Sequence, residues 1–325
     1  MYFREIGTTG IEISEIGLGC WTLGGLNWEE GRIANGWSPV DPAEAREAVA
    51  FALDNGVNHF DTADVYGNGL SERMLAESLG MKNNNVIIAS KVGWFRGTAA
   101  HAYEPQHIRH QCEQSLRNLK REYIDIYYFH HGNFGEKDCY LDDACETMGR
   151  LKAEGKIRCI GLSAYSEKDF KRLVPKMKPS VIQSWAHAMD YHFIAPGSAC
   201  MNLCKEYAMS FVAFSPLNQG ILLGKYSSDD PPHFPDGDHR SNSEKFKPAY
   251  LAGAENGIRA VSEELGGSRE ELVRMALQYV LYHDYVAGVI PGFRNREQVI
   301  MNLSACDKPL NGREVACVRK AFRSQ

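Results

Sequence analysis

Hydrophobic and polar positions along the chain follow two periods, and the period changes many times. Short apolar runs such as VIIAS at 86–90 and YIDIYYF at 123–129 are typical of buried strands. Between such runs, stretches such as 42–55 carry apolar residues three and four positions apart, which predicts helices. Asp41 before Pro42 indicates an N-cap with proline at the first helical position. The pattern therefore predicts strands and helices in alternation.

Eight strands are expected, at 15–19, 57–60, 86–90, 123–129, 158–163, 180–184, 211–214 and 286–290. Helices are expected at 42–55, 71–79, 105–119, 142–153, 167–174, 198–208, 255–265, 270–282 and 296–303. Such alternation implies parallel strands with right-handed crossovers, and eight such units close into a barrel. We therefore predict an α/β fold, a (β/α)8 TIM barrel, with residues 1–325 as one domain. An open doubly wound sheet is the alternative.

Three segments do not follow this alternation of strands and helices. Two short alternating strands flank the turn at 7–10 and predict a β-hairpin that plugs the N-terminal end of the barrel. Residues 313–323 predict an extra C-terminal helix. Residues 227–248 are rich in Ser, Asp, Pro and His and have no period. This loop follows strand seven, so it is either a lid over a ligand or a floppy insertion.

Composition narrows the class of protein. Lys plus Arg number 36 and Asp plus Glu 41, and the net charge of −5 argues against nucleic acid or anionic membrane as a partner. No run of 18 apolar residues and no signal-like N-terminus occur, so we expect a cytoplasmic protein with its nine cysteines reduced. Cys200 and Cys204 are four residues apart, but further ligands are lacking, so packing is preferred to metal binding.

Barrel enzymes place their chemistry just past the C-terminal ends of the strands. Asp61 ends strand two, Tyr66 lies on the following loop, Lys91 follows strand three, and His130 follows strand four. A phenol with a pKa of about 10 is a poor acid, but a neighbouring ammonium lowers that pKa. We therefore expect Lys91, held by Asp61, to acidify Tyr66, and a neutral His130 to orient a carbonyl oxygen. The hydride has to come from a cofactor.

Each of these residues also has an ordinary structural interpretation. Asp61 could cap a loop, Tyr66 before a glycine could be a turn residue, and Lys91 could be a solvated strand end. His130 is followed by His131, and either could be a core histidine. Their joint placement after three successive strands is what favours catalysis.

The chain resembles the aldo-keto reductase superfamily in six stretches that run in order from residue 60 to 302. They are FDTADVYGNGLSE, IIASKVGW, YIDIYYFHH, LKAEGKIRCIGLS, FSPLNQGILLGKY and VIPGFRNREQVIMN. The resemblance implies NADP(H)-dependent reduction of an aldehyde or ketone to an alcohol, or the reverse oxidation. Its catalytic tetrad falls on Asp61, Tyr66, Lys91 and His130, with Tyr66 as general acid or base.

The resemblance also implies a cofactor site. Ser163 and Gln183 match the positions that hold the nicotinamide carboxamide, and Phe214 matches the aromatic residue that stacks on the nicotinamide. The remaining expected cofactor contacts are Cys20, Trp21, Thr22, Asp61, Ser215, Leu217, Gly220, Leu222, Gly292, Arg294, Gln298 and Asn302. Gly17 and Gly19 would line the nicotinamide end.

The last helix, starting just after Arg294, independently suggests a phosphate site. Ala164 replaces an asparagine that is frequent in the family, and Gly292 replaces a lysine found in some branches, so the grip on a 2′-phosphate depends more on Arg294. The chain has no Rossmann fingerprint, because Gly17 and Gly19 are followed by loop-like sequence where that fingerprint needs a helix.

The expected substrate pocket consists of Trp21, Tyr66, Trp94, His130 and His131, with the loops at 27–38 and 227–248; core packing is the alternative for Trp94. The partner is a small carbonyl compound, and some related branches reduce sugars or small aldehydes. A barrel glycosidase is disfavoured because it needs two carboxylates across the mouth. A carbon–carbon double-bond reductase of this fold would carry Glu in place of His130. A non-enzymatic, redox-sensing nicotinamide-binding subunit remains open, as does the oligomeric state.

Overall fold

Eight parallel strands make a closed ring in the computed structural model, which describes residues 1–29 and 33–322. In hydrogen-bonded order they are β3 (Leu18–Gly19), β6 (His59–Asp61), β7 (Ile87–Val92), β8 (Ile124–Phe129), β9 (Ile157–Ser163), β10 (Val181–Trp185), β11 (Ser210–Phe214) and β12 (Val286–Ile290). Parallel bridges from Ile16 to Val289 and from Gly19 to Gly292 join the two ends of the sheet. The predicted (β/α)8 barrel is confirmed.

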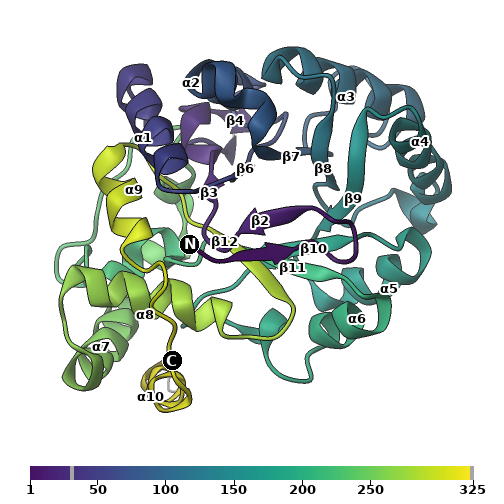
Figure 1. Cartoon of the computed structure of the whole chain (residues 1–325). Helices are drawn as coiled ribbons and strands as arrows, with labels where there is room; N and C mark the ends of the chain where they lie inside the picture. The colour runs from purple at the N-terminus through teal and green to yellow at the C-terminus, as the bar shows by residue number, and fades with distance from the viewer. Residues whose placement is uncertain (30–32, 323–325) are drawn as a thin grey trace.

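Helices surround this ring (Figure 1). Those packed around the barrel are α1 (Pro42–Asp54), α2 (Leu70–Leu79), α3 (Pro105–Leu119), α4 (Leu141–Ala153), α5 (Glu167–Met177), α6 (Ala199–Tyr207), α8 (Arg269–Leu281) and α9 (Arg296–Leu303). Two more, α7 (Pro248–Leu265) and α10 (Gly312–Phe322), pack against each other. The predicted C-terminal helix is thus present, although Arg323 lies outside the described residues. Asp41 caps α1 as expected, because its carboxylate accepts from the Ala43 amide at 2.7 Å.

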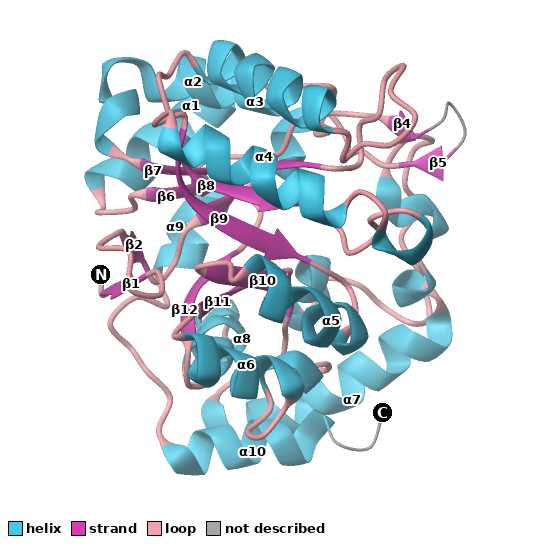
Figure 2. Ribbon diagram, turned by 90° about the vertical axis from the view of Figure 1, so that its right-hand side faces the viewer, coloured by secondary structure: helices cyan, strands magenta, loops and turns pink. Residues whose placement is uncertain are grey.

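A β-hairpin of β1 (Phe3–Glu5) and β2 (Glu12–Ser14) covers one end of the barrel. Its Ile6, Ile11 and Ile13 pack against residues inside the ring, and the Gly7 amide donates to Ser210 Oγ at 2.8 Å where β11 begins. Figure 2 shows this hairpin and a second pair, β4 (Trp28–Glu29) with β5 (Ile33–Ala34), at opposite ends of the barrel. The N-terminal plug is therefore confirmed.

Alternation along each strand decides which side chains enter the barrel. Ala89, Ile126 and Tyr128 pack with the hairpin isoleucines inside the ring, whereas Ile88 and Phe129 belong to the layer between strands and helices. Gly161 leaves the space that the Tyr128 ring fills. Residues two positions further along the same strands form the next inward layer, and Lys91 and His130 fall in it.

Three local expectations differ from the structure. Lys91 lies within β7 and not after it, because β7 continues to Val92. Helix α7 begins at Pro248 and not at residue 255. Gly253 and Gly257 interrupt its apolar stripe in the sequence, which hides the first turns of the helix, although the stripe continues. Phe322 packs where a Gly257 side chain would be. The segment expected to be loop after Trp21 contains the β4–β5 pair, whose two-residue strands are too short to show alternation; residues 30–32 lie outside the described part.

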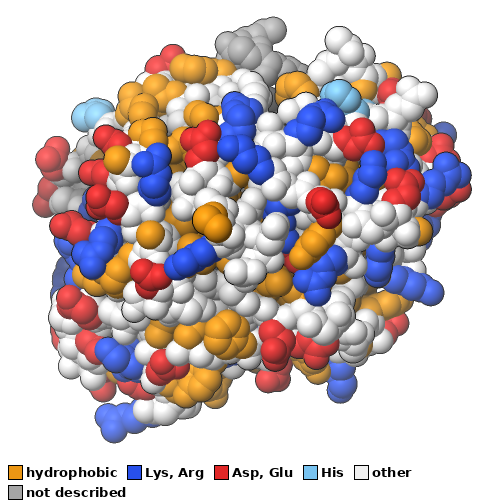
Figure 3. Space-filling model, turned by 45° about the horizontal axis from the view of Figure 1, so that its top comes forward, with side chains coloured by type: hydrophobic (Ala, Val, Ile, Leu, Met, Phe, Trp, Pro, Cys, Tyr) orange, Lys and Arg blue, Asp and Glu red, His pale blue; other side chains and the backbone are white. Residues whose placement is uncertain are grey.

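Other sequence expectations concern the surface and the cysteines. Among the described residues, no helix is long and apolar enough to cross a membrane. Cys200 and Cys204 are both buried in the main core, which agrees with packing. On the face drawn in Figure 3, basic and acidic side chains are interspersed and not gathered by sign.

Candidate active site

A cavity of about 1180 Å³ opens at the C-terminal ends of the strands. The strand ends reach it through Asp61 of β6, Ser163 of β9, Gln183 of β10 and Phe214 of β11. These four residues lie at or near the C-terminal ends of their strands, and their side chains face into the barrel. Strand alternation therefore delivers polar side chains to one mouth, where a barrel fold normally keeps its chemistry.

The four residues proposed as a tetrad meet at one end of this cavity. The Lys91 ammonium contacts the Asp61 carboxylate, donates to the Thr62 carbonyl at 2.8 Å, and lies 3.5 Å from the Tyr66 hydroxyl. The His130 ring packs edge-on against Tyr66, with centroids 5.7 Å apart. Tyr66, His130 and Asp61 border the cavity, whereas Lys91 is buried behind them. The structure thus brings the four side chains together.

The protonation states are set by burial. Burial lowers the pKa of His130 well below its usual 6.5, and the Lys91 charge lowers it further, so the imidazole is neutral. Burial raises the pKa of Tyr66 well above its usual 10, and the Asp61 carboxylate adds to this effect. The expected acidification of Tyr66 is not found as a net effect, because burial is the largest influence on the Tyr66 pKa and raises it.

The nicotinamide-binding residues expected from the family lie beside this cluster. The Gln183 amide donates to the second Asp61 oxygen at 2.8 Å. The Ser163 hydroxyl is buried at the cavity and has no partner among the described residues. A buried hydroxyl normally has a hydrogen-bond partner. An unsatisfied Ser163 beside the Gln183 amide therefore fits a bound carboxamide.

The far end of the cavity is basic. Arg294, Lys225 and Arg269 line it, and none forms an ion pair within the described part of the chain. Partial burial and the nearby guanidinium groups of Arg240, Arg294 and Arg269 lower the pKa of Lys225. The N-terminus of α9, capped by Asn295, lies at the same end. Clustered cations beside a helix N-terminus fit the phosphates of a dinucleotide.

Most of the expected cofactor and substrate residues border the cavity. They are Gly19, Cys20, Trp21, Thr22, Asp61, Tyr66, Trp94, His130, Ser163, Gln183, Phe214, Ser215, Leu217, Gly220, Gly292, Arg294, Gln298 and Asn302. Gly17 and Leu222 do not. Leu222 is fully buried in the core, because the turn at 218–223 directs its side chain inward. Gly17 packs against His59.

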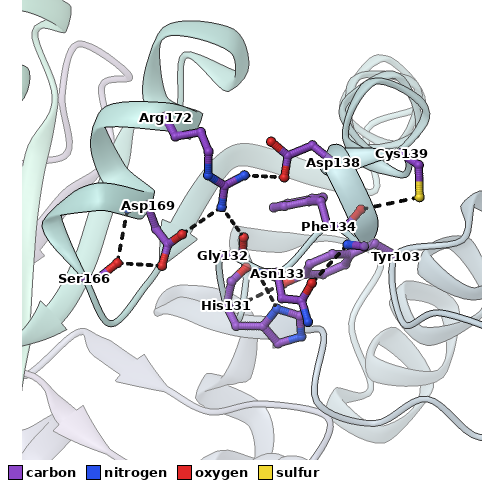
Figure 4. A network of polar contacts seen from close by, with 11 residues as sticks. Tyr103, His131, Gly132, Asn133, Phe134, Asp138, Cys139, Ser166, Asp169 and Arg172 are labelled. Carbon is purple, nitrogen blue, oxygen red and sulfur yellow. Dashed lines mark hydrogen bonds and ion pairs between the residues drawn. The ribbon is translucent and has the colours of Figure 1, made fainter.

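His131, expected in the substrate pocket, does not border the cavity. Its ring nitrogens bond to the Gly93 carbonyl at 2.9 Å and to the Asn133 amide at 3.1 Å. The Tyr103 hydroxyl donates to the His131 carbonyl and accepts from its amide, at 2.8 and 3.0 Å. Figure 4 shows this network, in which Arg172 also donates to the Gly132 carbonyl at 2.6 Å. His131 therefore holds the loop after β8 and does not contact the cavity.

The long loop at 227–248 packs over the cavity. Asp238 accepts from the Ser38 amide and hydroxyl at 2.8 and 2.7 Å and pairs with Arg240 at 2.8 Å. His239 packs on Trp21 with ring centroids 5.0 Å apart. These contacts join 227–248 to the loop at 27–38 across the cavity. We name residues 227–248 the cover segment.

Several cavity residues are absent from the set that the sequence predicts. Tyr165 and Trp185 lie just past β9 and at the end of β10, so inspecting the end of every strand would have found them. Lys225 and Arg269 come from a turn and a helix start far apart in sequence. No local pattern distinguishes these two from ordinary surface cations. Lys245 lies in the loop at 227–248, which the sequence assigns to the pocket without singling out this residue.

Comparison with known proteins agrees with this geometry. Residues 15–322 match the Aldo/keto reductase family. L-glyceraldehyde 3-phosphate reductase of Escherichia coli K12 is 25% identical, over 94% of this chain and 87% of the relative. A holo aldo-keto reductase from Bacillus halodurans has a TM-score of 0.76 at 27% identity, covering 99% of this chain and 96% of that one. A glycerol dehydrogenase from Gluconobacter oxydans has a TM-score of 0.80 at 25% identity, covering 99% and 95%.

The family and these neighbours support oxidoreduction between carbonyl and alcohol groups with a nicotinamide cofactor. Together with the closed barrel and the cavity at its C-terminal end, the match over 15–322 shows that the chain belongs to the aldo/keto reductase family.

Proposed function

We propose that residues 1–325 act as one catalytic unit that reduces an aldehyde or ketone to an alcohol with NADPH, or catalyses the reverse oxidation. Tyr66 is the proton donor, His130 orients the carbonyl oxygen, and Lys91 and Asp61 hold the site. The observation that carries the proposal is the 3.5 Å approach of the Tyr66 hydroxyl to the buried Lys91 at the cavity wall. When bound, the reduced nicotinamide supplies the hydride, which no side chain can give.

The protein's own residues control the proton. A neutral His130 retains one ring N–H, and it can donate that hydrogen to a carbonyl oxygen without adding a charge. Tyr66 stays a protonated phenol at neutral pH because its pKa is raised. An alkoxide is a stronger base than a phenolate, so proton transfer from Tyr66 to the developing alkoxide is favourable even so. In the reverse direction, a raised pKa makes the phenolate a strong but scarce base.

The preference for NADP over NAD rests on the basic end of the cavity. Lys225, Arg269 and Arg294 have no carboxylate partner among the described residues, and a 2′-phosphate would supply an anionic one. Guanidinium groups bind phosphate through paired hydrogen bonds, which adds geometry to charge. Arg294 also belongs to the loop that precedes α9, so it lies beside the N-terminus of that helix.

The test compares wild-type protein with Tyr66→Phe, using NADPH oxidation with a reactive aldehyde such as 4-nitrobenzaldehyde. We expect the variant to turn over roughly 10²- to 10⁴-fold more slowly, the usual contribution of a general acid. NADPH binding, followed by fluorescence, should not change, because the substitution removes only a hydroxyl. Tyr282→Phe, at a half-exposed position outside the cavity, is the matched control. Equal turnover by Tyr66→Phe and wild type would remove the proton-donor role.

A further inference from the structure

Aromatic rings surround the end of the cavity that holds Tyr66. Six of them contact one another in series, with centroid separations between 5.7 and 6.4 Å: Trp21, Tyr66, His130, Trp94, Tyr165 and Trp185. All six border the cavity. We name this series the aromatic belt. Such walls favour a flat or apolar body next to the reacting carbonyl.

Lys245 provides a cation beside the Trp185 end of the belt. It belongs to the short 3-10 turn Glu244–Phe246 in the cover segment and borders the cavity. Lys245 and Trp185 also border a second, neighbouring cavity of about 890 Å³, so the two side chains form the wall between the cavities. Lys245 therefore lies in the cavity wall beside Trp185.

The Lys245 ammonium has few partners. Its one hydrogen bond among the described residues goes to the buried Asn218 Oδ1 at 2.9 Å, although an ammonium has three donors. No carboxylate in the described part of the chain lies within ion-pair distance of it. Asp190 acts on it electrostatically, but the Asp190 oxygens accept from Trp185 and His192 at 2.8 and 2.6 Å. Burial lowers the Lys245 pKa, as expected for a desolvated cation without a close counter-charge.

The carboxylates that border the cavity do not complement this cation. Asp61 is already paired with Lys91, and Glu44 and Glu297 belong to α1 and α9, the helices beside Arg294. Partly buried charges are normally paired, so an unpaired lysine at a cavity wall indicates a missing anion.

We propose that the carbonyl substrate carries an anionic group, a carboxylate or a phosphate, which Lys245 binds at the end of the aromatic belt. The inference rests on the proposed carbonyl reduction and specifies its substrate class. Lys225, Arg269 and Arg294 already provide cations at the cofactor end, so Lys245 is left for the substrate. A cationic substrate, which an aromatic belt alone would suit, is disfavoured by the same ammonium.

The experiment measures kcat/KM for two matched pairs of aldehydes with NADPH. The first pair is 4-formylbenzoate and 4-formylbenzamide, and the second is glyceraldehyde 3-phosphate and glyceraldehyde. Within each pair the carbonyl is similar, and the difference of interest is the charge. Wild type should prefer the anionic member of at least one pair, and the pair that shows the preference identifies carboxylate or phosphate.

Lys245→Met should lower the ratio of anionic to neutral kcat/KM by about tenfold or more, the loss expected for one charge-assisted hydrogen bond. Lys245→Arg should restore most of the ratio. Lys247→Met is the matched control, because Lys247 is exposed, pairs with Glu244 at 2.6 Å and does not border the cavity. NADPH affinity, measured by fluorescence in each variant, should stay within about twofold of wild type.

Three outcomes would overturn the inference. An unchanged ratio in Lys245→Met, with the neutral aldehydes still reduced, would remove the anion site and leave carbonyl reduction intact. If Lys245→Met loses NADPH affinity and its kcat/KM falls equally for both members of a pair, Lys245 is a cofactor residue. Absence of turnover with all four aldehydes would overturn the proposed function and this inference with it.

Discussion

Asp61 is the residue on which the polar end of the cavity depends. One carboxylate oxygen contacts Lys91 and the other accepts from Gln183, so a single buried side chain orders two neighbours from different strands. Removing one partner of a buried ion pair leaves an uncompensated charge and costs several kcal/mol, typically about 3–5. Substitution of Asp61 or Lys91 would therefore lower both the stability and the catalytic activity of the protein, and an activity assay would not separate the two effects. Tyr66 and Arg294, at the cavity surface, are cleaner positions to change.

Arg294→Ala tests the cofactor preference at the same scale. We expect NADPH affinity to fall about tenfold or more, because one charge-assisted hydrogen bond to a phosphate is lost. NADH affinity should change little, since it lacks the 2′-phosphate. Fluorescence titration with both cofactors provides the measurement. Arg296→Ala is the control, because the Arg296 guanidinium packs over the Phe51 ring at 4.6 Å and is outside the cavity. An equal loss of affinity for both cofactors would contradict the role of Arg294.

At the scale of elements, the barrel strands hold the reacting groups and the loops close over them. The cover segment has little regular structure of its own, yet its backbone pairs with the early loop through the Gly36–Asp238 bridge and the bond from the His239 amide to the Gly36 carbonyl at 2.8 Å. Arg240 also lies over the rings of Trp37 and Phe234, at 4.3 and 4.1 Å. Order in this segment therefore comes from tertiary contacts.

Asp238→Asn should loosen this cover. The change removes the charge that pairs with Arg240 and weakens the two bonds from Ser38, while the barrel strands are untouched. We expect limited proteolysis within 227–248 to accelerate several-fold and NADPH to dissociate faster. Asp229→Asn, at an exposed position of the same segment, is the control. Cleavage at the wild-type rate would mean that Asp238 does not fasten the segment.

At the scale of the whole molecule, buried imidazoles link stability to pH. Burial lowers the pKa of both His59 and His283 from the usual 6.5 to about 4. The His283 Nδ1 bonds to the Tyr279 carbonyl at 2.9 Å and its Nε2 lies 3.1 Å from the Arg319 guanidinium, an arrangement that suits only the neutral ring. The charged forms are therefore disfavoured in the folded protein.

The sign of the effect follows from proton binding. Between pH 6.5 and about 4 the unfolded chain binds protons that the folded chain does not, so the free energy of unfolding falls as the pH is lowered through this window. Each such histidine contributes up to about 1.4 kcal/mol per pH unit. Urea unfolding at several pH values should show a shallower dependence for His283→Gln than for wild type, and no change for His233→Gln at an exposed position. A pH-independent wild type would refute the linkage.

Much of the fold and of the site was determined by the sequence itself. Periods of two and of three to four residues identify the eight strands and their helices, and strand alternation makes the residues near the strand ends converge. Asp61, Tyr66, Lys91 and His130 can be grouped in this way from the order of residues alone. These are local properties, since each depends only on near neighbours in the chain.

The tertiary structure alone decided how each side chain is used. Whether His131 and Leu222 face the cavity, whether Tyr66 is acidified or not, and whether residues 227–248 form a cover depend on groups distant in sequence. The same holds for Lys245, whose lack of a counter-charge within the described part of the chain is a property of its surroundings in space. Burial and electrostatics sum over all nearby atoms, so no run of consecutive residues encodes them.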